Sequence, residues 1–332
     1  MKRWRMPALL LILVCVLNLA GCASAQQKKQ TAVGFYLDTV ITLTAYVDDA
    51  AVLTDALAEC GRYERLLSRT VEGSDVWRVN HAGGKPVEVS DDTIVLLQTA
   101  RQVSEFSGGA FDVTIAPVST LWDFTSGAAV VPDTDAIAKA AALVDYTRMD
   151  VDVEGNTVTL PEGMMIDLGG IAKGYIADEV KQYLMDRGVE SAVLSFGGNI
   201  VTIGLKPDGS PWKVGIQDID RPTGEYMLVS LSYGGSTVTS GIYERGFESD
   251  GVYYHHILDP NTGWPIQNRL ASVTIFSDSS MWGDALATAA FALGPEDGMA
   301  LIEEINGAEA VFISRDRSVS ATSGADKYLA RP

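Results

Sequence analysis

The stretch Asp284-Ala285-Leu286-Ala287-Thr288 lies in a predicted helix over residues 280–293, and Gly294-Pro295 should end that helix. Four residues make close to one helical turn, so the Asp284 carboxylate and the Thr288 hydroxyl share one face. Both groups are hard oxygen ligands, which suit Mg²⁺ and are poor ligands for a soft metal. Because an Asp near a helix start is more often only a favourable partner of the helix dipole, a metal role needs support from other motifs.

A glycine-rich turn, Asp167-Leu168-Gly169-Gly170-Ile171-Ala172-Lys173-Gly174, precedes a predicted helix over residues 174–187. Glycines let the backbone approach a ligand, and a helix N-terminus offers unpaired N–H groups. Lys173 adds a positive charge. The motif is not a Walker A sequence, and the chain has no G-x-G-x-x-G, so neither a P-loop nor a Rossmann site is predicted. A structural turn and a ligand-binding turn both remain open.

Two of the three histidines lie in Tyr254-His255-His256-Ile257-Leu258-Asp259-Pro260. A His with an Asp three residues on could be a general base and its orienting partner, whereas a structural Asp-Pro turn is the alternative. A zinc site is not expected, because cysteine ligands and an H-E-x-x-H motif are missing.

The remaining periodicity mixes helices and strands. Helical spacing is predicted at residues 50–67, 92–106, 132–143 and 296–304, and strands at 35–47, 150–153, 157–160, 192–195, 212–216, 227–231, 237–240, 272–276 and 310–314. Further glycine turns lie at residues 106–114 and 195–199. Because this order is neither a regular βαβ alternation nor all-β, we predict an α+β fold with mixed α/β layers over residues 31–332.

The N-terminus predicts export and lipidation. Residues 1–21 have a basic start and a short apolar run, which is typical of a signal peptide and too short for a membrane span. Leu19-Ala20-Gly21-Cys22 resembles a bacterial lipobox, which implies cleavage before Cys22 and lipid attachment to it; an ordinary signal peptide is the alternative. Residues 22–30 are predicted to be a tether. We therefore expect an extracytoplasmic protein that is anchored to a bacterial membrane by lipid.

The formal charge of −18 argues against nucleic-acid binding, which needs a basic surface. Any phosphate site must then be local, built from backbone N–H groups, Lys173 and a metal. Only Cys60 remains beyond the N-terminal segment and Cys22, so no disulfide is predicted, and a buried structural thiol is the favoured interpretation.

Together these motifs resemble the ApbE family. The segments that carry the resemblance occur in the family's order and are residues 74–80, 107–117, 167–174, 197–199, 256–263 and 284–288. The resemblance implies an α+β fold with an FAD cleft between two closely packed halves. It also implies a Mg²⁺-dependent FAD:protein FMN transferase, which joins FMN to a Thr or Ser of a partner protein and releases AMP. The implied acceptors carry a Ser/Thr-Gly-Ala-Thr/Ser type motif and are membrane redox-complex subunits or exported flavoproteins.

The resemblance also implies roles for single residues. Asp284, Thr288 and the carbonyl of Ala172 match the metal ligands, and His256 matches the general base, although a one-residue ambiguity with His255 remains. The residues matched to the FAD cleft are Ser107, Ala110, Asp112, Lys173, Gly198, His256 and Asp259. Two alternatives stay open: an FAD pyrophosphatase that yields FMN and AMP, and a flavin-binding lipoprotein without catalysis.

Overall fold

The computed structural model describes residues 27–124, 130–220 and 224–330. The predicted signal peptide at residues 1–21 and the lipidation site Cys22 lie outside the described residues. Within the described part of the chain, none of the helices is both long and apolar enough to cross a membrane.

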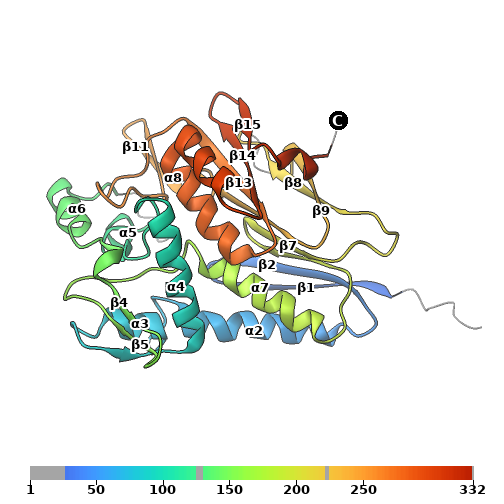
Figure 1. Ribbon diagram of the computed structural model, residues 1–332, viewed down its shortest axis with the longest axis horizontal. Coiled ribbons are helices and arrows are strands. Elements are labelled where there is room, and N and C mark those ends of the chain that lie inside the picture. Colours follow the sequence, from blue (N-terminus) through green and yellow to red (C-terminus); the bar gives the residue numbers. More distant parts are fainter. Residues whose placement is uncertain (1–26, 125–129, 221–223, 331–332) are drawn as a thin grey trace, which may run out of the picture.

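An eight-stranded antiparallel sheet forms the centre of the molecule, with the order β1-β2-β6-β7-β10-β13-β14-β15 (Figure 1). Its strands are β1 (Lys28–Tyr36), β2 (Thr39–Val47), β6 (Ala192–Phe196), β7 (Asn199–Ile203), β10 (Ser236–Gly241), β13 (Leu270–Ser277), β14 (Ala308–Ser314) and β15 (Val319–Ala321). The sheet therefore joins segments from both ends of the chain.

Helices α2 (Ala51–Leu67), α7 (Ala172–Met185) and α8 (Ser280–Glu304) cover one face of this sheet (Figure 1). A hairpin of β8 (Trp212–Gln217) and β9 (Tyr226–Ser232) contributes to a second apolar cluster on the other face. Successive strand residues point to opposite faces, and accordingly Phe312 belongs to the helix-side core while Val311 and Ile313 belong to the second cluster. Because both faces are covered here, every residue of β13 is buried.

A smaller part of the molecule packs beside the sheet and its helices. It contains α3 (Asp75–Asn80), α4 (Asp91–Phe106), α5 (Ala116–Trp122), α6 (Thr134–Ala141), a small sheet of β3 (Val87–Glu88), β5 (Thr157–Thr159) and β4 (Asp150–Asp152), and a ribbon of β11 (Gly246–Ser249) and β12 (Val252–His255). Short 3-10 helices, η1 (Tyr146–Arg148) and η2 (Ala325–Lys327), complete the described elements. The Nε1 of buried Trp122 donates to the carbonyl of Gly263 at 2.8 Å, which ties the loop after β12 to α5. The α+β prediction is confirmed.

The N-terminal strand prediction is partly wrong. A single strand was expected over residues 35–47, but β1 and β2 form a hairpin that turns at Leu37 and Asp38, whose φ angles are 55° and 54°. Two-residue hairpin turns need such positive φ angles, which Asp tolerates and Leu rarely adopts, so the sequence lacked a turn signal. The Leu37 N–H donates to Glu64 Oε1 of α2 at 2.8 Å, a tertiary contact that stabilises the turn. β1 also begins at Lys28, inside the segment expected to be a tether.

The predicted helices agree better with the structure. Gly294 has a non-helical conformation (φ 84°, ψ −178°) and interrupts α8 at the predicted end of the first helix, and the helix predicted at residues 296–304 follows as the second part of α8. Cys60 of α2 is buried as predicted, and desolvation raises the pKa of its thiol to about 12.

Candidate active site

A cleft of about 730 Å³ lies where the central sheet, the start of α7 and the loop after β12 meet. Eight of the predicted site residues line it: Ala110, Asp112, Ala172, Lys173, Gly198, His256, Asp284 and Thr288. Ser107 and Asp259 are not among its lining residues. Segments that are far apart in the sequence are therefore brought to one cavity.

Asp284 and Thr288 line the cleft from consecutive turns of α8. Asp284 is only 3% exposed, and its Oδ2 accepts a hydrogen bond of 2.9 Å from the backbone N–H of Gly174. The Thr288 Oγ1 lies 3.3 Å from the Oγ of Ser240 on β10. The carboxylate is thus held by the first turn of α7, and the hydroxyl by the sheet.

Lys173 is placed at the same point of the cleft. Its Nζ donates to the carbonyl of Gly169 at 3.0 Å and lies 3.6 Å from Asp284 Oδ1. The ammonium group stands in the first turn of α7, where the helix dipole is also positive. This end of the cleft is therefore suited to phosphate oxygens despite the acidic net charge.

The donor set here fits Mg²⁺. The candidate ligands are a carboxylate, a hydroxyl and the backbone of Ala172, all oxygen donors, which are the type that Mg²⁺ prefers. Among the described residues, no group of three or more His, Cys, Asp or Glu could hold a metal ion. A site with one carboxylate suits a metal that takes its remaining ligands from water and substrate phosphates rather than from an all-protein cage.

The structure distinguishes the two neighbouring histidines. His255 is fully buried, its Nε2 lies 2.9 Å from the carbonyl of Ile266, and its Nδ1 accepts from the Ile257 N–H at 3.3 Å. Both ring nitrogens of His255 are therefore used by the backbone. His256 lines the cleft instead, which makes it the histidine that can reach a substrate.

The hydrogen-bond partner of His256 decides its tautomer. Its Nδ1 lies 3.1 Å from the carbonyl of Arg245, and a carbonyl only accepts, so Nδ1 carries the hydrogen and Nε2 is the basic nitrogen of the neutral ring. Desolvation, with smaller contributions from the nearby Lys173 and Arg245 charges, lowers the pKa of His256 to about 4. The imidazole is consequently neutral at pH 7 and able to accept a proton.

Asp259 does not orient His256. Its Oδ1 accepts from the N–H of Asn261 at 2.9 Å, and its Oδ2 accepts from the hydroxyl of Thr262 at 2.9 Å. The carboxylate thus shapes the turn of residues 259–263, and the orienting partner of His256 is the Arg245 carbonyl.

Ser107 and Asp112 also hold loops. The Oγ of Ser107 accepts from the Phe111 N–H at 3.1 Å at the end of α4. Asp112 accepts from the N–H and hydroxyl of Thr114 through Oδ1 and from the Tyr146 N–H through Oδ2. Desolvation raises the pKa of the Asp112 carboxyl, although these hydrogen bonds oppose that rise. Asp112 therefore contributes to the cleft mainly by fixing its wall.

Gly198 is required by a close approach. A Cβ at this position in the β6–β7 turn would lie 2.7 Å from both Glu244 Oε1 and the carbonyl of Thr239. Gly198 therefore leaves room for the Glu244 side chain, which remains exposed to cleft solvent. Partial desolvation and the charge of Asp284 raise the pKa of Glu244, while Lys173 opposes the rise.

The structure adds charged groups that the sequence motifs missed. Glu244 and Arg245 line the cleft after β10, and Arg69 lines it from the loop after α2, where its Nε lies 3.1 Å from Asp167 Oδ2. Arg69 has no glycine turn or repeated spacing around it, so only the fold brings it to the site.

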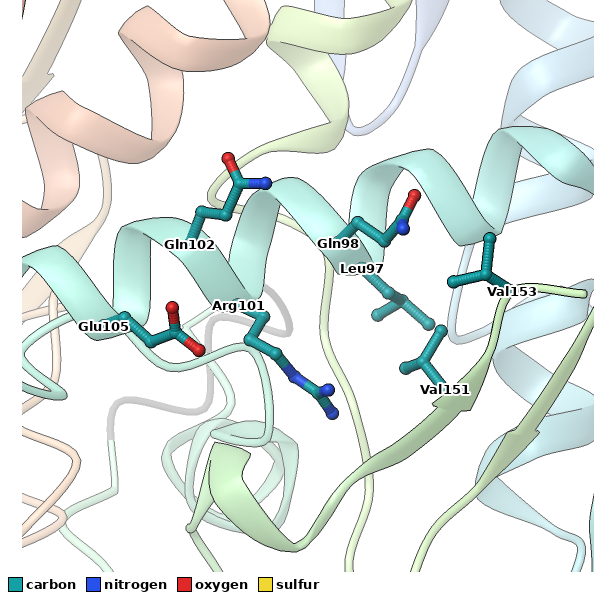
Figure 2. A pocket seen from close by; sticks show the side chains of 7 residues that line it. All are labelled: Leu97, Gln98, Arg101, Gln102, Glu105, Val151 and Val153. Atoms are coloured by element: carbon teal, nitrogen blue, oxygen red, sulfur yellow. The ribbon is translucent and has the colours of Figure 1, made fainter.

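A second, smaller pocket of about 180 Å³ lies between α4 and β4 (Figure 2). Its lining side chains are Leu97, Gln98, Arg101, Gln102, Glu105, Val151 and Val153. The Arg101 guanidinium already donates to the carbonyl of Met149. This pocket contains none of the predicted site residues, so the larger cleft is the candidate active site.

Comparisons with known proteins identify the family of this chain. The model of the ApbE family matches residues 37–312, which include the lining of the whole cleft. An FAD:protein FMN transferase of Treponema pallidum is 36% identical, over 94% of this chain and 92% of its own length. An FAD:protein FMN transferase of Klebsiella pneumoniae is 38% identical, over 85% of this chain and 88% of its own length. The crystal structure of the ApbE protein of Thermotoga maritima has a TM-score of 0.85 at 29% identity and covers 92% of this chain and 100% of its own. The chain therefore belongs to the ApbE family.

Proposed function

We propose that this chain is an FAD:protein FMN transferase that uses Mg²⁺ and acts on an acceptor protein outside the cytoplasm. The observation that carries the proposal is that Asp284, Thr288, Lys173 and a neutral His256 line one cleft. A hard-metal pair, a cation and a base are the groups that transfer of a phosphoryl-linked nucleotide requires.

In the proposed reaction, the acceptor Thr or Ser oxygen attacks the phosphorus of the FMN half of FAD. A new P–O bond joins FMN to the acceptor, the bridging P–O bond of the pyrophosphate breaks, and AMP leaves. The Nε2 of His256 takes the hydroxyl proton, because Nδ1 is already engaged with Arg245. Negative phosphates near His256 would raise the pKa of the ring and strengthen it as a base.

Asp284, Thr288 and the Ala172 backbone would hold the metal. Bound Mg²⁺ supplies charge stabilisation to the phosphate oxygens of the pyrophosphate. Lys173 binds phosphate oxygens from the same end of the cleft, since its Nζ lies beside Asp284. The chain itself thus contributes mainly positioning and electrostatic stabilisation.

Location and acceptor complete the proposal. The Leu19-Ala20-Gly21-Cys22 sequence supports lipid attachment at Cys22 and anchoring on the outer side of a bacterial membrane. Suitable acceptors are membrane redox-complex subunits or exported flavoproteins with a Ser/Thr-Gly-Ala-Thr/Ser type motif. Replacing Cys22 with Ser should abolish incorporation of labelled fatty acid into the protein and leave activity in detergent extracts unchanged.

The direct test is mass spectrometry of residues 23–332, which keep all of β1, mixed with FAD, Mg²⁺ and an acceptor domain that bears this motif. A mass gain of one FMN on the acceptor, with release of AMP and complete loss on addition of EDTA, is the expected result. FAD that remains intact under these conditions would instead indicate a flavin carrier.

Hydrolysis is the competing reaction, because Glu244 is exposed to solvent inside the cleft and water can therefore enter it. Water in place of the acceptor hydroxyl would give free FMN and AMP. The rates of AMP release with and without acceptor separate the two: we expect the acceptor to raise the rate, whereas equal rates and an unmodified acceptor would favour a pyrophosphatase.

A further inference from the structure

Asp178 of α7 contacts the beginning of α8 through three hydrogen bonds. Its Oδ2 accepts from the hydroxyl of Ser279 at 2.8 Å and from the N–H of Met281 at 3.0 Å, and its Oδ1 accepts from the N–H of Ser280 at 2.9 Å. The first N–H groups of a helix have no partner within the helix, so this carboxylate satisfies donors that would otherwise be unpaired. Asp178 is not among the residues that line the cleft.

A second contact joins the same two helices one turn away. Gly174 lies four residues before Asp178 on α7, and its N–H donates to Asp284, which lies four residues after Ser280 on α8. A Cβ on Gly174 would lie 2.1 Å from the Ser280 carbonyl, so the two helices touch through their backbones. Two contacts one turn apart on antiparallel helices restrict both sliding and rotation of α8 against α7.

We propose that Asp178 is a positioning residue for the metal-binding pair, which acts by holding α8 so that Asp284 and Thr288 face the first turn of α7. Without Asp178, the first N–H groups of α8 lose their partner on α7, and only the contacts of Gly174 and Lys173 with Asp284 among those described above still oppose rotation of α8. Rotation would move Asp284 and Thr288 together, because they lie on one face of α8. This inference rests on the proposed metal role of those two residues.

The test measures metal affinity apart from turnover. Mn²⁺ serves as the probe, and its dissociation constant is measured by electron paramagnetic resonance with FAD present in a His256→Asn background, where transfer is blocked. We expect Asp178→Ala to raise that constant by about 10-fold, the lower end of the range for groups hydrogen-bonded directly to metal ligands, because Asp178 acts on Asp284 and Thr288 only through α8. In the native background, the Mg²⁺ concentration for half-maximal transfer should rise by a similar factor, and excess Mg²⁺ should restore kcat.

Asp75 offers a matched control. It is also a buried carboxylate that holds a helix start, accepting from the Ser90 N–H at 2.7 Å and from the Thr93 hydroxyl at 2.8 Å at the beginning of α4. Asp75→Ala should lower the melting temperature but leave the Mn²⁺ dissociation constant within about twofold, because α4 carries no proposed metal ligand. An equal rise of the Mn²⁺ dissociation constant in Asp178→Ala and Asp75→Ala would show that Asp178 stabilises the fold in general and does not position the metal ligands.

Other outcomes are equally decisive. Asp178→Asn keeps the size of the side chain and one acceptor oxygen, so it should fold and should raise the Mn²⁺ dissociation constant less than Asp178→Ala does. A Mn²⁺ dissociation constant that is unchanged in both variants would overturn the inference. Asp284→Ala separates the two levels of the argument. If Asp284→Ala leaves Mn²⁺ binding unchanged, the proposed metal site itself is wrong. If Asp284→Ala loses Mn²⁺ binding while Asp178→Ala binds Mn²⁺ normally, only the positioning role of Asp178 is rejected.

Discussion

At His256, one backbone contact and partial burial set the chemistry of the side chain. The Arg245 carbonyl keeps the hydrogen on Nδ1, and desolvation lowers the pKa so that Nε2 is unprotonated at pH 7. His255, the preceding residue and the last of β12, uses both nitrogens for the backbone and packs edge-on against Phe291. Alternation along an extended chain sends neighbouring side chains in opposite directions, which explains these different environments.

We predict that His256→Asn binds FAD normally but loses transfer by about 10²–10⁴-fold, the usual contribution of a general base. FAD affinity is checked by fluorescence quenching, and transfer by the mass gain of the acceptor. His255→Asn is the control: it should lower the melting temperature and retain most of the turnover of the folded enzyme. Turnover that stays normal in His256→Asn would remove this residue from the mechanism.

The buried His255 should also make stability depend on pH. Burial lowers its pKa from 6.5 to about 4, so between these values the unfolded chain binds a proton that the folded chain does not. The free energy of unfolding therefore falls as the pH falls through this window, by up to about 1.4 kcal/mol per pH unit, and this contribution is fully present above pH 6.5.

Urea unfolding of the wild type and His255→Asn at several pH values isolates this effect, because the contributions of other titrating groups cancel in the difference. The stability gap between the two proteins should narrow from pH 6.5 to pH 4. A gap that stays constant would show that His255 is not held neutral by the fold.

At the scale of elements, the contact between α7 and α8 decides where Asp284 and Thr288, the proposed metal ligands of α8, lie. We predict that Gly174→Ala lowers both stability and metal affinity, because the new Cβ would lie 2.1 Å from a backbone carbonyl that cannot turn aside. The expected loss is about 1–3 kcal/mol in the free energy of unfolding, typical of overpacking. Urea unfolding and Mg²⁺-dependent activity check the two effects.

Gly61→Ala in α2 controls for the change of residue type. A Cβ there would meet the ring of Tyr36 at 2.9 Å, a side chain that is able to move, while Ala favours a helix over Gly by about 1 kcal/mol. We therefore expect a smaller change in stability and an unchanged Mg²⁺ requirement. A Gly174→Ala protein as stable and as active as Gly61→Ala would contradict the close packing of the two helices.

At the scale of the whole molecule, the cleft joins the sheet and its helices to the smaller part that carries Ala110, Asp112 and His256. A ligand that bridges these parts should stabilise the entire fold. At a concentration about 100-fold above its dissociation constant, FAD with Mg²⁺ should add about 2.7 kcal/mol to the free energy of unfolding. In a thermal-shift assay, the rise in melting temperature caused by FAD should be clearly smaller with EDTA than with Mg²⁺. In Asp284→Ala, this rise should no longer depend on Mg²⁺. Equal shifts with and without EDTA would place the metal outside the FAD site.

The sequence alone determined the local elements and their chemistry. Helical spacing identified most of α2, α4 and α8, and Gly294-Pro295 marked the break in α8, because helix periodicity and glycine or proline interruptions depend on neighbouring residues. The same short-range logic paired Asp284 with Thr288, and the motif order predicted the family and thereby eight of the residues that line the cleft.

Only the tertiary structure decided which groups meet. It divided residues 35–47 between the end of β1, a turn that contacts Glu64, and β2. It also assigned Asp259 to a loop turn and brought Arg69 and Glu244 to the cleft. It also distinguished His256 from His255 and joined Asp178 to the start of α8. The physical reason is that burial, pKa and hydrogen-bond partners depend on segments distant in the chain, whereas helix and turn patterns depend on residues a few positions apart.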